Sequence, residues 1–368
     1  MHDGQERDAS RRPAVTLRGT GSGSSVPGGG RATGAALPEG PDDSLATREM
    51  PAPPVPDERE AARRATDSLA PRGFGARYEI LERLGTGGMG EVRLCRDRVI
   101  GREVAMKTIR STRLDATHQW RFVREARVQG QLEHPAVVPV YDLGVDPDGY
   151  PYFTMKRVLG VGLDTVVARL AGGDHETIRR FARRKLLRRF VQIALAVDFI
   201  HSRGVVHRDL KPANLMLGDF GEVYVLDWGL VKLVEADAEL EARMIVDASG
   251  AVRTSRGTVL GTPGYMSPEA LRGEVERVDA RSDVYSLGVV LFEVLALEPL
   301  HPRGAMAQKL VSMLQTDGAR PGERAPRLRV AAELDAICAR ATRLEADHRF
   351  PSARALAESI EAYLDGSG

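Results

Sequence analysis

The spacing of apolar residues changes near residue 160, and this change constrains the fold more than any other feature of the chain. Before it, apolar and polar residues alternate in short runs separated by Gly-rich turns, as in half-buried strands. We expect strands at 78–80, 92–94, 104–106, 137–145 and 150–155, and one amphipathic helix from about Ala116 to Leu132. After it, apolar residues recur at helical spacing in segments 176–201, 280–297, 331–344 and 352–364. The sequence therefore predicts an α+β fold of two lobes, a small antiparallel sheet with one helix and then a larger helical lobe.

Residues 1–72 differ from the rest in composition, being rich in Gly, Pro, Ser, Ala and Arg. Large apolar residues are too sparse there to offset the entropy of ordering the chain. We predict a disordered N-terminal arm over 1–72 and a folded domain over 73–368. Within the domain, the first lobe is expected at about 78–158 and the second at about 159–364. For the arm we favour a plain linker. A docking or phosphoacceptor tail is the functional alternative.

Charge and cysteine content exclude several classes of function. The 52 basic and 51 acidic residues nearly cancel, so neither nucleic acid nor an anionic membrane is expected as a partner. Cys95 and Cys338 lie far apart without a partner motif, which argues against a disulfide framework or zinc site. The N-terminus lacks an apolar signal region, and no apolar stretch approaches the roughly 20 residues of a membrane span. We therefore predict a cytoplasmic protein.

A glycine-rich segment, Gly85-Thr86-Gly87-Gly88-Met89-Gly90, lies between two expected strands. A dinucleotide-binding loop would need a helix to begin here. Instead, Glu91 and Val92 continue into a strand. In a hairpin, glycines allow the backbone to approach phosphate groups and donate N–H groups to them. A simple tight turn explains the segment equally well.

The next strand carries Lys107 among apolar residues. Burying a lysine is costly unless an anion accompanies it. Glu125, on the expected helix that follows, is its natural partner. An edge lysine that points into water is the alternative.

The segment His207-Arg208-Asp209-Leu210-Lys211-Pro212-Ala213-Asn214 is followed, thirteen residues after Asn214, by Asp227-Trp228-Gly229. Together with the glycine-rich segment, Lys107 and Glu125, these residues resemble the catalytic loop and metal-binding Asp of protein kinases. The resemblance covers nearly everything after the arm. The motifs are most similar to those of the eukaryote-like Ser/Thr kinases of bacteria, with Trp228 in place of the usual Phe.

This resemblance implies roles for four catalytic residues. Asp209 would accept or orient the proton of the substrate hydroxyl, and Lys211 would reach the γ-phosphate. Lys211 also indicates Ser/Thr specificity, because tyrosine-directed relatives usually have Ala or Arg there. Lys107, paired with Glu125, would contact the α- and β-phosphates.

The resemblance also implies ATP as the nucleotide and Mg²⁺ as its metal, with Mn²⁺ as an alternative. Asn214 and Asp227 would hold the metal ion. Adenine would lie between Val92 and Ala105 on one side and Met216 on the other. The complete set of expected ATP-binding residues is Leu84, Gly85, Thr86, Gly87, Gly88, Met89, Gly90, Glu91, Val92, Ala105, Lys107, Met155, Lys156, Val158 and Met216.

The segment from Gly261 to Glu269 resembles the peptide-positioning loop of the family. Thr262 is expected to bond Lys211 and Asp209 and to position the substrate, and Glu269 is expected to pair with Arg349. Asp283 resembles the buried aspartate that anchors the catalytic loop.

Three hydroxyl residues upstream, Thr254, Ser255 and Thr258, are the expected phosphoacceptors of the activation segment. Arg208 directly precedes Asp209, and a phosphate on this segment could bond its guanidinium. Thr254 and Thr258 rank above Ser255, because relatives mostly use threonine here. A solvated loop with a structural Arg208 is the alternative.

Taken together, these motifs predict a protein kinase that transfers the γ-phosphate of ATP to Ser/Thr hydroxyls of proteins in bacterial signal transduction. Autophosphorylation of the activation segment, through transient self-association, is expected. A catalytically inactive scaffold and a small-molecule kinase are the alternatives, and the chain is either a stand-alone kinase or a fragment of a longer receptor kinase.

Overall fold

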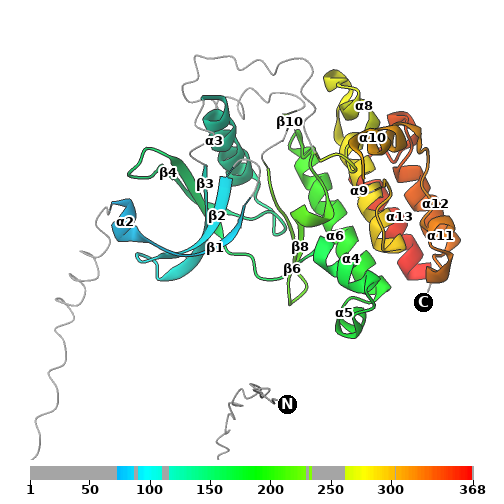
Figure 1. Cartoon of the computed structure of the whole chain (residues 1–368), viewed down its shortest axis with the longest axis horizontal. Coiled ribbons are helices and arrows are strands. Elements are labelled where there is room, and N and C mark those ends of the chain that lie inside the picture. Colours follow the sequence, from blue (N-terminus) through cyan, green and yellow to red (C-terminus); the bar gives the residue numbers. More distant parts are fainter. Residues whose placement is uncertain are drawn as a thin grey trace, which may run out of the picture. The chain divides into compact units, whose positions relative to one another are not determined.

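The computed structural model describes residues 73–86, 90–109, 116–228, 232–233, 262–302 and 304–366. The chain divides into two units, residues 1–58 and 59–368, and all of the described residues belong to the second (Figure 1). The predicted arm at 1–72 therefore lies outside the described residues, and its boundary stays a prediction.

Five antiparallel strands form the sheet lobe, in the order β1-β2-β3-β5-β4 (Figure 1). The strands are β1 (Tyr78–Thr86), β2 (Gly90–Asp97), β3 (Arg102–Ile109), β4 (Val140–Val145) and β5 (Pro151–Lys156). A short helix, α2 (Phe74–Arg77), precedes β1, and α3 (Ala116–Gln131) lies between β3 and β4, packed against β4 and β5.

The alternation of residues along β3 gives the sheet two different faces. Val104 and Met106 are buried on one face, in a cluster with residues of β1, β2 and β5. Ile109 is buried on the opposite face, where it joins Phe122 and Phe153 between the sheet and α3. Lys107, two residues before Ile109, therefore shares the face that α3 covers.

The helical lobe is built around α9, whose residues from Ser282 to Ala296 are all buried. A helix that is apolar on every side is stable only when other elements surround it. Here α6, α11, α12 and α13 pack against α9 (Figure 1). The helices of this lobe are α4 (Leu163–Ala171), α5 (His175–Arg180), α6 (Arg183–Ser202), α8 (Pro268–Leu271), α9 (Ala280–Ala296), α10 (Met306–Gln315), α11 (Pro321–Arg324), α12 (Ala332–Ala341) and α13 (Ala353–Gly366).

Short strands and 3₁₀ turns lie in the segments that connect the helices of the helical lobe. One small sheet has the order β6-β8-β9, and a second pairs β10 with β7. The strands are β6 (Val161–Gly162), β7 (Val205–Val206), β8 (Leu215–Leu217), β9 (Val223–Val225) and β10 (Lys232–Leu233). The 3₁₀ turns are η2 (Pro212–Asn214), η3 (Val275–Arg277), η4 (Pro326–Leu328) and η5 (Ala346–His348).

The predicted α+β arrangement of two lobes is confirmed, with differences in detail. The helix expected over 176–201 is two helices, because Phe181 leaves helical geometry at φ −118° and ψ 49° and buries its ring. The strand expected from 137 begins at Val140. Helices α4 and α10 were not predicted.

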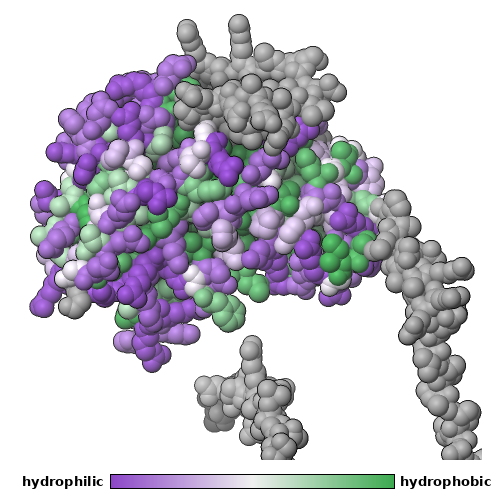
Figure 2. Space-filling view, turned by 180° about the vertical axis from the view of Figure 1, so that it is seen from behind, coloured by the Kyte–Doolittle hydropathy of each residue, from purple (hydrophilic) through white to green (hydrophobic). Residues whose placement is uncertain are grey.

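The described surface in Figure 2 is mostly hydrophilic, with hydrophobic residues near the middle of the view and at its right side. Among the described helices, none combines the length and the apolar character that a membrane span requires.

Candidate active site

Lys107 and Glu125 form a buried ion pair between β3 and α3. The Nζ atom of Lys107 lies 2.5 Å from Oε1 of Glu125, and the two side chains are 12% and 2% exposed. The Oδ1 atom of Asp227 is 3.6 Å from the same Nζ. Burial alone would lower the pKa of Lys107, but the two carboxylates outweigh burial and raise it. Lys107 is therefore a charged group held inside the molecule, and the edge lysine pointing into water is excluded.

Asp209, the third residue of the motif from His207 to Asn214, is buried, and four donors hold its carboxylate. Thr262 donates its backbone N–H and its hydroxyl to Oδ1, at 3.1 and 2.7 Å. Lys211 Nζ donates to Oδ2 at 2.6 Å, and Asn214 Nδ2 donates to the same oxygen at 3.1 Å. Lys211 also donates to Thr262 Oγ1 at 2.6 Å. The expected contacts among Asp209, Lys211 and Thr262 are therefore all present.

Asp283, at the start of α9, fixes the backbone that leads into Asp209. Its fully buried carboxylate accepts the N–H groups of His207 and Arg208 at 2.8 and 2.9 Å. His201 Nε2 lies 2.8 Å from the same carboxylate. Burial would raise the pKa of Asp283, but the hydrogen bond with His201 leads the interactions that lower it.

Arg208 has a left-handed backbone conformation with φ 68°. Such a conformation costs free energy in a residue other than glycine, so surrounding contacts must hold it. The bond from Arg208 N to Asp283 supplies one such contact. The Nε atom of Arg208 is buried and has no hydrogen-bond partner among the described residues.

Asn214 and Asp227 offer oxygen atoms for a metal ion. Asn214 donates its Nδ2 to Asp209, with bonds to both the backbone O and Oδ2, which leaves Oδ1 as its ligand atom. Asp227 is 48% exposed and has a left-handed backbone with φ 63°. In the described part of the chain, no group of three or more His, Cys, Asp and Glu side chains could hold a metal. This donor set fits Mg²⁺, which usually binds one or two carboxylates together with substrate phosphates.

Trp228, next to Asp227, packs its ring against His207 with the ring centroids 4.9 Å apart. Its indole Nε1 is buried and has no hydrogen-bond partner among the described residues. Burial lowers the pKa of His207, and its Nε2 lies 3.1 Å from the backbone oxygen of Leu226.

Most of the expected ATP-binding residues that the structure describes lie on strands of the five-stranded sheet. Leu84, Gly85 and Thr86 belong to β1, and Gly85 and Thr86 pair with Val92 and Glu91 of β2. Ala105 of β3 pairs with Met155 of β5, Met216 lies on β8, and Val158 follows β5. Gly87, Gly88 and Met89 lie outside the described residues, as do Thr254, Ser255 and Thr258.

Gly90 is required by a close approach of two backbones. A Cβ atom at this position would lie 2.0 Å from the backbone oxygen of Thr108 on β3. No other residue type fits there without moving a strand. The last glycine of the motif thus has a packing role as well as its expected role beside ATP.

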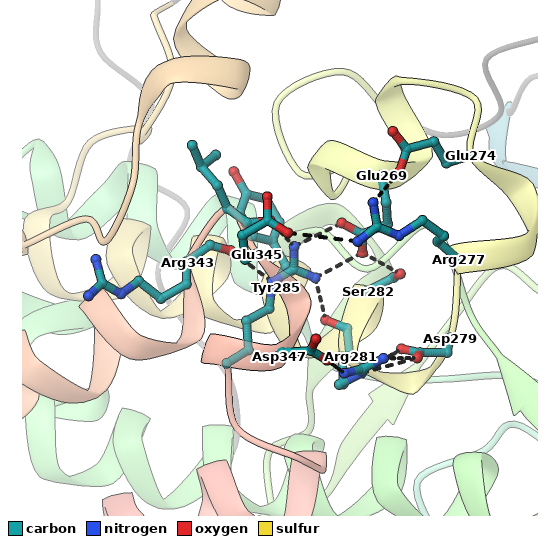
Figure 3. A network of polar contacts seen from close by, with 12 residues as sticks. Glu269, Glu274, Arg277, Asp279, Arg281, Ser282, Tyr285, Arg343, Glu345 and Asp347 are labelled. Atoms are coloured by element: carbon teal, nitrogen blue, oxygen red, sulfur yellow. Dashed lines mark hydrogen bonds and ion pairs between the residues drawn. The ribbon is translucent and has the colours of Figure 1, made fainter.

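Glu269 and Arg349 form a buried bidentate pair, as predicted, and Figure 3 shows the surrounding network. Both oxygens of Glu269 accept from Arg349 at 2.8 Å, and Ser282 Oγ donates to Oε1 at 2.7 Å. Arg349 also donates to the backbone oxygens of Arg281, Arg343 and Leu344. Burial opposes ionisation, but the hydrogen bond from Arg349 and its charge outweigh it and lower the pKa of Glu269 to about 2. The pair ties the segment after Thr262 to the start of α9.

Two contacts near the site were not predicted. Lys156 Nζ donates to the hydroxyl of Tyr224 on β9 at 2.8 Å and lies 4.8 Å from the centre of its ring. Gln129 Nε2, on α3, donates to the backbone oxygen of Val138 at 2.7 Å. Each of these residues is isolated in the sequence, and no motif indicates its partner.

Comparison with known proteins agrees with this geometry. A family model described as "Protein kinase domain" matches residues 78–350. The chain is 36% identical over 297 residues to serine/threonine-protein kinase PknD of Protochlamydia amoebophila, a match that covers 78% of this chain and 30% of that protein. It is 37% identical over 300 residues to a probable serine/threonine-protein kinase of Streptomyces coelicolor, covering 80% of this chain and 41% of that protein.

The PknD kinase of Chlamydia caviae is 36% identical over 298 residues, with 79% of this chain and 31% of that protein covered. The matched region thus spans less than half the length of each of these relatives. The family model, in contrast, extends from the first strand of the sheet to the residue after Arg349. The chain belongs to the protein kinase family.

Proposed function

We propose that this chain transfers the γ-phosphate of ATP to Ser and Thr hydroxyls of protein substrates and acts in bacterial signalling. Membership of the family implies ATP, a divalent metal ion and protein substrates. The observation that carries the proposal is the contact network of Asp209, Lys211 and Thr262, with all three polar side chains within 2.7 Å of one another.

Asp209 supplies an oriented carboxylate for the substrate hydroxyl. Phosphoryl transfer depends mostly on positioning and on neutralising charge, with little covalent work for the protein. The hydroxyl of Thr262 donates to Oδ1 of Asp209, the kind of bond that a substrate Ser or Thr would make. Lys211, 2.6 Å from Oδ2, holds this carboxylate in place and brings a positive charge to the transferred phosphate.

Lys107 supplies the positive charge for the α- and β-phosphates. Its pairing with Glu125 orients the ammonium group, because a buried lysine without an anion would tend to lose its proton. Asn214 and Asp227 would hold Mg²⁺, with Mn²⁺ as an alternative. Held by these two residues, the metal ion would supply positive charge against the negative charge of the phosphates during transfer.

Autophosphorylation at Thr254, Ser255 or Thr258, through transient self-association, belongs to the same proposal. The buried, unpartnered Nε of Arg208 supports it, since a phosphate oxygen would satisfy that donor. A cytoplasmic location stays a prediction.

The function is tested by incubating the purified chain with γ-labelled ATP, Mg²⁺ and peptides that differ only in a Ser, Thr or Tyr acceptor. Label on the Ser and Thr peptides but not on the Tyr peptide is expected. Binding of Mg-ATP without transfer to any peptide would contradict the proposal and identify a catalytically inactive scaffold. Transfer to the Tyr peptide alone would contradict the assigned specificity.

A further inference from the structure

A basic groove lies on the helical lobe, apart from the contacts described above. Its volume is about 740 Å³, and residues of α5, the start of α6 and the turn between β8 and β9 line it. Figure 1 shows α5 at the lower edge of this lobe. We call it the α6 groove.

The sequence of α6 explains why positive charge gathers there. Leu186, Leu187 and Phe190 are buried against the lobe, so the residues between them face outward. Lys185 and Arg188 are exposed, and Arg189 is half-buried beside Gly221. The apolar stripe of one helix thus orients three cations toward a single groove.

These three cations differ from their neighbours in having no side-chain partner among the described residues. Arg180 pairs with Asp219, and Arg183 donates to the backbone oxygens of Leu328 and Arg329. Lys185, Arg188 and Arg189, in contrast, make no ion pair or side-chain hydrogen bond with the part of the chain that the structure describes. Their charges therefore remain available to an anionic ligand.

Phe220, in the turn between β8 and β9, is 95% exposed and lines the same groove. The turn has a defined geometry, because Phe220 N donates to Glu222 Oε2 at 3.0 Å and Gly218 N donates to Glu222 O at 2.9 Å. Gly221 has φ 113°, a conformation that favours glycine. Aromatic and arginine side chains are the residue types enriched at protein interfaces, and a fully exposed phenylalanine is uncommon otherwise.

We propose that the α6 groove binds an acidic, extended segment of a protein substrate that carries an apolar side chain next to its carboxylates. The carboxylates would meet Lys185, Arg188 and Arg189, and the apolar side chain would cover Phe220. This assignment rests on the proposed function, because it takes the docked protein to be a substrate.

The lining of the groove favours a peptide over other anionic partners. Asp219 and Glu222 line it together with the cations. A bilayer surface or a nucleic acid backbone is anionic throughout and would be repelled by these two carboxylates. A peptide can direct its acidic residues toward α6 and its neutral residues toward the turn. The turn also connects Asn214 to Asp227 along the chain, so a docked substrate would be held on the lobe that carries Asp209.

Binding is tested without catalysis, using the full chain with Asp209→Asn. The probe is a fluorescein-labelled peptide with a central Leu between runs of Glu and no hydroxyl residue. Its binding is measured by fluorescence anisotropy. Arg188→Glu in the same background should weaken binding by about tenfold or more, and added salt should weaken it for the parent. Arg327→Glu reverses another exposed arginine of the lobe, also unpaired among the described residues, and should bind as the parent does. Phe220→Ser should weaken binding without changing its salt dependence.

Equal binding by the Arg188→Glu and Arg327→Glu variants would overturn the proposal, and so would an absence of binding by the parent. If the chain instead sedimented with phosphatidylserine vesicles and did not bind the peptide, the groove would be a site for a membrane surface and the proposal would be overturned.

The catalytic consequence is tested separately in the active chain. Arg188→Glu should raise KM for a substrate with an acidic tail and leave kcat unchanged. A short substrate without the tail should show no change in either constant, and a change there would overturn substrate docking. Peptide binding by a chain that transfers no phosphate to any substrate would contradict the proposed function and still support the groove as a site for acidic peptides.

Discussion

Thr262 and Asp209 are joined by two hydrogen bonds to one oxygen atom. The backbone N–H and the hydroxyl of Thr262 both donate to Oδ1, at 3.1 and 2.7 Å, although 53 residues separate them in the chain. The end of the activation segment is thereby fixed to the proposed catalytic carboxylate. A change in either residue is expected to affect substrate positioning as well as chemistry.

Asp209→Asn should nearly abolish transfer while the fold is retained. The carboxylate would lose its charge, and the amide could no longer accept a proton from the substrate. A general base commonly contributes about 10²- to 10⁴-fold to the rate, so kcat should fall by that factor. Initial rates with saturating Mg-ATP measure the loss of transfer. Thermal unfolding followed by circular dichroism tests whether the fold is retained. Wild-type turnover in this variant would show that the loop has another role.

Thr262→Val and Thr262→Ser separate the hydroxyl from the backbone bond. Valine removes the bonds that Oγ1 makes with Asp209 and Lys211 and keeps the backbone N–H bond, whereas serine keeps all of them. We expect the valine variant to lower kcat/KM by about tenfold or more and the serine variant to be close to wild type, since a charged hydrogen bond is commonly worth about 1.5–3 kcal/mol. Steady-state kinetics on one peptide substrate measure both, and equal rates for the two variants would exclude a role for the hydroxyl.

Lys107→Met should abolish turnover and also destabilise the fold. It leaves Glu125 as a buried, unpaired carboxylate, and breaking a buried pair in this way typically costs about 3–5 kcal/mol. The double variant Lys107→Met/Glu125→Leu removes both charges and should recover most of that stability without recovering activity. Urea unfolding and transfer assays on the two variants distinguish a structural lysine from one that acts on phosphate. If the double variant recovered activity together with stability, Lys107 would have a structural role only.

Glu269 makes the stability of the fold depend on acid pH. Its folded pKa, about 2, lies below its ordinary value of 4.5, so its stabilisation is complete above about pH 4.5 and is lost as the pH falls toward 2. The full effect is roughly 3 kcal/mol, of which about 1 kcal/mol is lost by pH 4. Urea midpoints at neutral pH and at pH 4 measure this loss. Glu269→Gln/Arg349→Met, which removes both charges of the pair, should lose correspondingly less stability between the same pH values, and an identical loss would contradict the assignment.

The residues themselves show why some contacts could be predicted from the sequence and others could not. The strands and the long helices were predicted from the spacing of apolar residues. Val104 and Met106, for example, are two positions apart and must share one face of a strand. The pairs of Lys107 with Glu125 and of Glu269 with Arg349 were predicted because each residue sits in a motif with a known order, although 18 and 80 residues separate the partners.

Contacts between residues outside any motif were not predictable in the same way. His201 lies near the end of α6 and could face any side of the lobe, so its contact with Asp283 follows only from the packing of α6 on α9. Strands of two or three residues, such as β6 and β8, are too short to show a period. The break at Phe181 depends on a buried ring that propensity alone does not reveal.

Lys156→Met should leave the KM for ATP unchanged and destabilise the fold by about 1 kcal/mol, the usual contribution of a hydrogen bond. The side chain of Lys156 is directed at the hydroxyl of Tyr224, so the backbone of the strand end stays available to the nucleotide. Tyr224→Phe removes the same bond from the other side and should show the same loss of stability, and the double variant should add little further. Lys156→Glu should retain more stability than Lys156→Met, because a carboxylate can accept the tyrosine hydroxyl. ATP titrations and urea unfolding on the wild type and the four variants check these outcomes, and a large rise in the KM for ATP with Lys156→Met would show that the lysine side chain itself contacts the nucleotide.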